Sequence, residues 1–207
     1  VCSLSQERIT SQWVAHDGKI VNTLSFSPCG TWLATAGYDH TACLWRRPSG
    51  EGDAPWECTQ VVQGHSAPVK QVRFLQPQPQ SHLWLFTSSE DRSTQLLQVD
   101  SHTGQTTHLL TLAGGPTLAI HPSGRFVATG HDGPREGLLE VWALPQGQQL
   151  YSLRGPQYNG PFSFSPQGDL LACGTSDMFG DLRIWDVSPL QQQLQQDTDP
   201  DTEPTSP

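Results

Sequence analysis

Histidine and acidic side chains are the groups in this sequence that could do acid–base chemistry or bind a metal, and His16 with Asp39 is the leading pair. A histidine oriented by a carboxylate is a common general base, but it needs a nucleophile, and no G-x-S-x-G segment presents a serine. The eight histidines form no i, i+4 pair and no cluster with cysteine. No catalytic residue, metal or other cofactor is therefore expected.

The overall charge and the cysteines narrow the possible partners and the compartment. A formal net charge of -9 would repel a phosphate backbone, so no nucleic-acid partner is expected. No apolar run is long enough to span a bilayer, so no membrane association is expected. Five cysteines are scattered without a CxxC pair, which indicates reduced thiols in a cytoplasmic protein.

The residues from 16 to 45 form a template that the rest of the chain repeats. Short alternating apolar and polar runs, separated by turn residues, predict three antiparallel strands that each bury one face. The turn FSPCG at 26–30 recurs as IHPSG at 120–124 and FSPQG at 164–168, and Phe74 holds the place of Phe26. Three of the four units close on a tryptophan, at Trp45, Trp142 and Trp185.

These four copies, at a period of roughly 40 residues, resemble the WD-repeat (WD40) family of β-propellers over about residues 8 to 188. The resemblance implies an all-β fold of four blades, which would be a partial propeller with open ends. The expected units are 16–63, 64–112, 113–153 and 154–188. They follow an outer strand of a preceding or closing blade within 1–15, where the run 9–14 is strand-like. A disordered tail is expected over 189–207.

The number of units bears on whether the ring closes. Members of the family usually carry about seven blades, so the chain is expected to be the C-terminal portion, a fragment, of a longer propeller. A closed ring of four remains the alternative. Open strand edges would favour self-association.

The resemblance also implies a buried hydrogen-bond network in each blade, which links a histidine, a hydroxyl, the turn aspartate and the tryptophan. The first unit carries all four residues, and the second has Leu97 where tryptophan is expected, with Thr87 or Ser88 as its hydroxyl. The third and fourth lack the histidine. The expected network residues are His16, Thr35, Asp39, Trp45, His65, Asp91, Asp132, Trp142, Asp177 and Trp185.

Partners of this family often dock on the face formed by the outer-to-inner loops and the second-to-third strand turns. The residues expected to bind a partner there are Tyr38, His40, Arg92, His131, Arg135, Tyr158, Met178 and Phe179. Met178 and Phe179 are the sharpest candidates, because two apolar residues in a polar turn need a partner. The alternative is that they fold back over the blade.

The function that follows is a non-catalytic scaffold for a protein or peptide partner, expected to be the C-terminal region of a larger signalling or assembly protein. The alternative is a propeller enzyme or ligand-binding protein that uses the central channel. The starts of the inner strands, such as Ile20-Val21 and Pro161-Phe162, are mostly apolar, which argues against a channel site.

Overall fold

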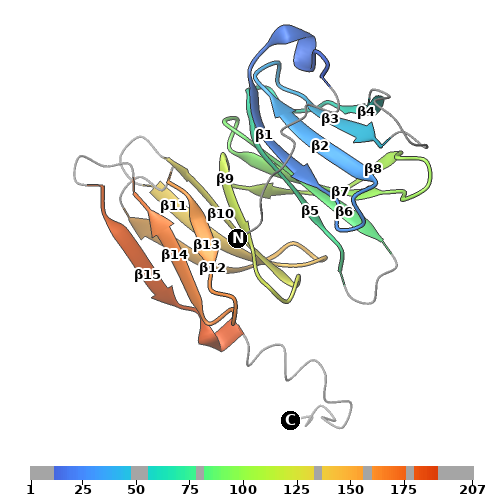
Figure 1. Ribbon diagram of the computed structural model, residues 1–207. Helices are drawn as coiled ribbons and strands as arrows, with labels where there is room; N and C mark the ends of the chain where they lie inside the picture. The colour runs from blue at the N-terminus through green and yellow to red at the C-terminus, as the bar shows by residue number, and fades with distance from the viewer. Residues whose placement is uncertain are drawn as a thin grey trace, which may run out of the picture. The chain divides into compact units, whose positions relative to one another are not determined.

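A computed structural model describes residues 12–47, 56–77, 82–132, 137–155, 160–175 and 180–190. The all-β expectation is confirmed: the described strands form four antiparallel sheets of four, four, four and three strands (Figure 1). The chain divides into two compact units, Val1–Pro116 and Thr117–Pro207. The first unit holds sheets 1 and 2, and the second holds sheets 3 and 4.

In the first unit, each sheet is a meander whose strands pair in chain order. A short 3-10 helix, η1 (His16–Gly18), leads into sheet 1. Sheet 1 consists of β1 (Val21–Phe26), β2 (Trp32–Gly37), β3 (Ala42–Arg46) and β4 (Glu57–Val62). Sheet 2 consists of β5 (Val69–Leu75), β6 (Leu83–Ser89), β7 (Ser93–Val99) and β8 (Thr106–Ala113).

The second unit repeats the meander, with one strand fewer in its last sheet. Sheet 3 consists of β9 (Thr117–Ile120), β10 (Phe126–Asp132), β11 (Gly137–Ala143) and β12 (Gln148–Gly155). Sheet 4 consists of β13 (Phe162–Phe164), β14 (Leu170–Gly174) and β15 (Leu182–Asp186). The β-strand propensity of these runs and the turns between them therefore produce the elements that the alternating pattern predicts.

Sheets 1 and 2 pack face to face over an apolar core. Trp32, Leu44 and Val62 of sheet 1 lie in one cluster with residues of sheet 2 such as Leu85 and Leu97. The inner strands are also joined by polar contacts. Asn22 on β1 donates to the carbonyl of Val69 on β5 at 2.7 Å, and the Thr23 and Ser25 hydroxyls accept from backbone N–H groups of β5. These contacts satisfy backbone groups that the edge strand β5 would otherwise leave unpaired.

Sheets 3 and 4 share a second apolar core, and a histidine forms a hydrogen bond between their turns. The buried residues of this core include Leu139, Val141, Phe162 and Leu171. His121, which takes the place of the serine of the FSP turn, is buried, and its Nε2–H donates to the carbonyl of Gly168 at 2.9 Å. A Cβ at residue 168 would stand 2.2 Å from that nitrogen, so only glycine permits this approach.

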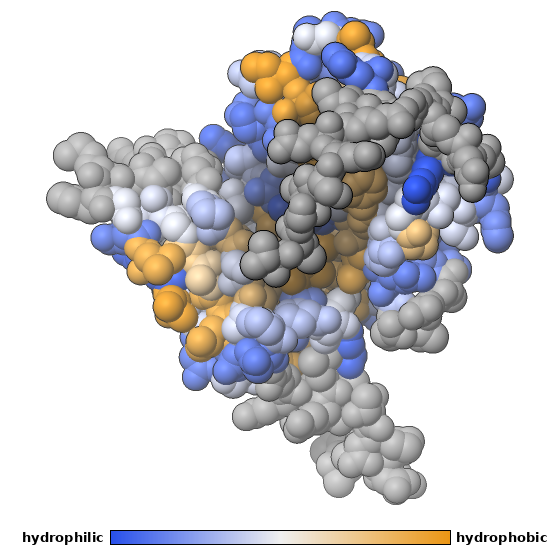
Figure 2. Space-filling model, viewed as in Figure 1, coloured by the Kyte–Doolittle hydropathy of each residue, from blue (hydrophilic) through white to orange (hydrophobic). Residues whose placement is uncertain are grey.

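The last sheet has an exposed apolar side. Within the described residues, β15 pairs with β14 alone, because sheet 4 has no fourth strand. Leu182 and Ile184 on β15 are 72% and 61% exposed. The apolar surface in the region of β14 and β15 is visible in Figure 2.

The structure corrects three expectations from the sequence. In the run 9–14, residues 12–14 are not in a strand, and 9–11 lie outside the described residues; Trp13 instead packs against Trp45, with ring centroids 5.5 Å apart. The expected disordered tail begins too early, because Leu190 is fully buried in the core of the second unit. His131 and Asp132, expected in a turn, continue the ladder of β10 as partners of Leu138 and Gly137.

Candidate interaction surface

A chain of buried hydrogen bonds lies across sheet 1. His16 of η1 places its Nδ1 3.0 Å from the Asp39 carboxylate and its Nε2 2.7 Å from the Thr35 hydroxyl. The Trp45 indole N–H donates to the same hydroxyl at 2.9 Å. Because a carboxylate only accepts, Nδ1 carries the proton and Nε2 accepts from Thr35. One directional relay of hydrogen bonds thus runs from Trp45 through Thr35 and His16 to Asp39.

Two local features make room for this relay. A Cβ at Gly37 would stand 2.1 Å from His16 Nδ1, so the histidine can enter only beside a glycine. His40, with φ of 71°, adopts the left-handed conformation that closes the tight turn between β2 and β3. Partial burial alone would raise the pKa of Asp39, but hydrogen bonds from Thr41 and His16 outweigh it and lower that pKa.

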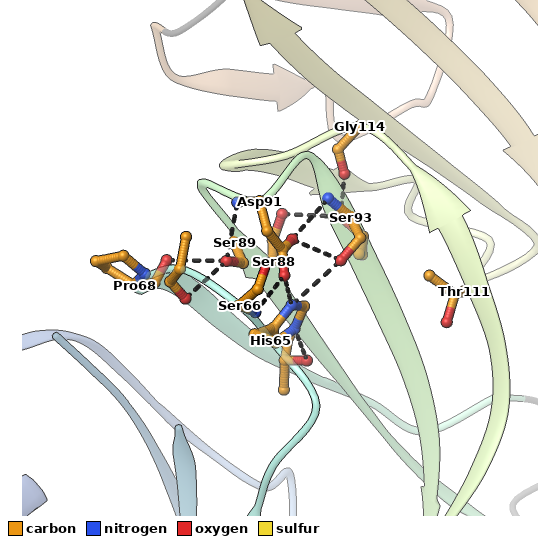
Figure 3. Close-up of polar contacts among 12 residues, drawn as sticks. His65, Ser66, Pro68, Ser88, Ser89, Asp91, Ser93, Thr111 and Gly114 are labelled. Atoms are coloured by element: carbon orange, nitrogen blue, oxygen red, sulfur yellow. Dashed lines mark hydrogen bonds and ion pairs between the residues drawn. The ribbon is translucent and has the colours of Figure 1, made fainter. Parts of the chain in front are cut away.

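Sheet 2 repeats the relay without its last member. His65 Nδ1 lies 2.9 Å from Asp91, and His65 Nε2 lies 2.9 Å from the Thr87 hydroxyl. Figure 3 shows Asp91 held from several sides, with Ser66 N–H and the Ser93 hydroxyl also donating to it. Leu97 pairs with Leu85 as Trp45 pairs with Leu33, so a leucine stands in the place of the indole.

Within the described residues of the second unit, sheet 3 keeps the tryptophan end of the network. The Trp142 indole N–H donates to the Thr129 hydroxyl at 2.9 Å. On β14, Cys173 holds the place of that threonine, and Trp185 Nε1 is buried with no hydrogen-bond partner within the described part of the chain. Burial raises the pKa of the Cys173 thiol. Asp177 lies outside the described residues.

The exposed candidates in the first unit lie at one end of sheets 1 and 2. Tyr38 and His40 belong to the β2–β3 turn, Arg92 belongs to the β6–β7 turn, and all three are exposed. The Lys70 ammonium lies 5.5 Å from the centroid of the Tyr38 ring and 3.1 Å from a Glu90 carboxylate oxygen. We call Tyr38, His40, Lys70, Glu90 and Arg92 the rim.

The other partner-binding candidates fall elsewhere. His131 is half-buried near the end of β10, so it lies in a ladder and not in a loop. The remaining four, Arg135, Tyr158, Met178 and Phe179, lie outside the described residues. The part that Lys70 plays in the rim was not foreseen, although a single lysine at the start of an apolar inner strand was the available signal.

The arrangement offers little for catalysis. His16 and His65 are buried, and both ring nitrogens of each are engaged in hydrogen bonds, so neither has a free lone pair for a substrate. Within the described ranges, no group of three or more His, Cys, Asp or Glu side chains could hold a metal ion. None of the described helices has the length and apolar character needed to cross a membrane.

Comparisons with known proteins point to one repeat family. The family model described as "WD domain, G-beta repeat" matches residues 7–46 and 56–96. Pre-mRNA-processing factor 19 of Oryza sativa is 24% identical over 84% of this chain and 31% of its own length. The Protein LST8 homolog of Drosophila melanogaster is 27% identical over 87% of this chain and 56% of its own length.

A shorter match and a solved structure agree with these relatives. A probable cytosolic iron-sulfur protein assembly protein 1 of Botryotinia fuckeliana is 40% identical over 28% of this chain and 13% of its own length. The crystal structure of the Cps50 (Swd1) β-propeller domain of Myceliophteria thermophila superposes with a TM-score of 0.63 at 15% identity. It covers 82% of this chain and 51% of that chain, so the likeness shows the propeller fold alone.

Proposed function

Since this chain is a WD40-repeat protein, we propose that it is a non-catalytic scaffold that binds a protein or peptide partner at the rim. The buried relays hold the β2–β3 and β6–β7 turns, because Asp39 and Asp91 accept hydrogen bonds from within those turns and from the histidines beneath. A rigid turn presents its exposed side chains without a large loss of conformational entropy on binding.

The observation that carries the proposal is the arrangement of Tyr38, Lys70 and Glu90. An exposed aromatic ring, with a lysine over its face and that lysine paired to a carboxylate, presents an apolar surface with a charged margin. Arg92 adds a second cation. Aromatic and arginine side chains contribute most of the binding energy in many protein interfaces. The charged groups of both signs around the Tyr38 ring would supply specificity for a partner.

The finer part of the proposal is a role in the assembly or signalling of a larger protein. The chain spans 31% of the rice relative and 56% of the fly relative. The rice relative is a pre-mRNA-processing factor, and the fungal relative is a probable cytosolic iron-sulfur protein assembly protein. These names support a scaffold in a multi-protein complex, and the partner at the rim would be a member of such a complex.

We also propose that the protein is cytoplasmic, and the free thiols support this proposal. Cys43 and Cys173 are free and buried, and burial raises the pKa of Cys43 to about 12. An un-ionised buried thiol suits a reducing compartment, in which disulfides are rare.

Site-specific photo-crosslinking tests the rim. A benzophenone amino acid at position 38 should give a discrete adduct with a protein partner in lysate, and Arg92→Ala should reduce its yield. The matched control is His102→Ala, because His102 lies in the turn after β7, at the other end of that strand from Arg92. An adduct whose yield falls equally in both variants, or the absence of any adduct at 38, would rule out the rim as the binding surface.

A further inference from the structure

Sheet 4 exposes apolar side chains at positions that are buried in sheet 1. In sheet 1, Ala42 and Leu44 are fully buried against sheet 2. In sheet 4, the same register positions hold Leu182 and Ile184, which are 72% and 61% exposed. We call this face of sheet 4 the leading face, and it is formed by Leu170, Ala172, Leu182 and Ile184.

Sheet 1 shows the converse on its other side. On β5 of sheet 2, Val69 and Val72 are fully buried against sheet 1. The same register positions on β1 hold Val21 and Leu24, which are 41% and 55% exposed, and Phe26 beyond them is 56% exposed. We call this face of sheet 1 the trailing face, and it is formed by Val21, Leu24 and Phe26.

Two pairs of sheets within the chain show how such faces fit together. Between sheets 1 and 2, the side of sheet 1 that corresponds to the leading face packs on the side of sheet 2 that corresponds to the trailing face. Sheets 3 and 4 pack in the same way, since Phe126 and Val141 of sheet 3 and Phe162 of sheet 4 lie in one core at those register positions. A free leading face and a free trailing face are therefore complementary.

The polar groups at the edges of the two faces also match. Between sheets 1 and 2, the Ser25 hydroxyl accepts from the Phe74 N–H at 3.3 Å. Ser163, which is exposed, holds the place of Ser25 in sheet 4. The N–H of Ser27 donates to β2, and successive N–H groups of a strand point to opposite sides, so the N–H of Phe26 points away from β2. A serine acceptor and a free donor thus stand at equivalent places.

We propose that the leading face of one copy of this chain packs on the trailing face of a second copy. Both faces are exposed in the single chain, so the described residues cover neither, and a second copy carries the matching face for each. Burial of Leu182, Ile184 and Leu24 from water stabilises the contact. Trp13 and Trp56, which cover β2 and β3 on that side of sheet 1, border it. Because the two faces differ, the contact is heterologous and yields a closed ring or an open chain of copies.

The test is complementation between two charged variants, measured by sedimentation-velocity ultracentrifugation. The parent chain should associate at about 100 μM. Ile184→Lys disables the leading face and Leu24→Lys disables the trailing face, and each variant alone should associate at least about tenfold more weakly, because an unpaired ammonium resists burial. Each variant keeps the face that the other has lost, so their mixture should form a one-to-one complex and nothing larger.

Three outcomes would overturn the proposal: a parent chain that stays monomeric up to about 500 μM, either folded variant alone associating as the parent does, or a mixture that remains monomeric. Leu182→Lys takes the place of Ile184→Lys if circular dichroism shows that the latter does not fold.

The matched control is Leu109→Lys, because Leu109 on β8 is 39% exposed and belongs to neither face. It should associate like the parent, and a loss of association equal to that of Ile184→Lys would contradict the assignment of the faces. Tyr38→Ala should also associate like the parent, so failure of this contact and failure of the rim give different results.

Discussion

Replacing Thr35 by valine tests the relay of sheet 1 against that of sheet 2. Valine keeps the branched shape but removes the hydroxyl, which leaves two buried groups without a partner: the Trp45 N–H and the His16 Nε2. Each orphaned group costs about 1.5 kcal/mol, so Thr35→Val should lower the free energy of unfolding by about 3 kcal/mol. In sheet 2 the hydroxyl of Thr87 hydrogen-bonds only to the His65 ring among the described residues, so Thr87→Val should cost about half as much.

Urea denaturation followed by far-UV circular dichroism measures both values. Thr35→Ser is the control, because it keeps the hydroxyl and loses one methyl group, at a cost of about 1 kcal/mol. A Thr35→Val variant that is destabilised no more than Thr87→Val would refute the reasoning, since the tryptophan link would then contribute nothing.

Four further outcomes are expected. The lowered pKa of Asp39 stabilises the fold above about pH 4, and this stabilisation is lost as the pH falls through that pKa. Asp39→Asn should therefore make the free energy of unfolding less dependent on pH in acid. An unchanged dependence between pH 5 and 2 would contradict this role of Asp39. Burial lowers the pKa of His121, so stability present above about pH 6.5 is lost on acidification, and His121→Gln should show less of this loss in urea midpoints. Burial raises the pKa of Glu140, so its protonated form stabilises the folded state at low pH, and this stabilisation is lost as the pH rises through that pKa. Glu140→Gln should therefore stabilise the protein at pH 7.5 but not at pH 4. Equal effects at the two pH values would contradict this prediction. Ile184→Lys should reduce self-association through β15 in concentration-dependent light scattering, and undiminished association would locate the contact elsewhere.

Much of the fold could be predicted, because its signals are local in the chain. Alternation at period two selects strands, and turns such as FSPCG place their boundaries within a few residues of those observed. Corrections occur where a distant contact overrides the local signal. Leu190 looks like part of a polar tail, but it finds an apolar core to fill.

The residues of the candidate site were predicted unevenly. Tyr38 and Arg92 follow from their place in turns, because turn residues lie on the surface whatever the packing. The position of Lys70 over the Tyr38 ring depends on sheet 1 packing against sheet 2. Neither spacing nor composition reports the distance between two sheets.

The amino-acid sequence by itself determined the repeat, the strands and the residue types of the relay, since each depends on neighbours a few positions away. Only the tertiary structure decided which polar groups are satisfied. Lys70 of sheet 2 contacts the Tyr38 ring of sheet 1 because the two sheets meet at one distance, and that distance is set by the side chains of both.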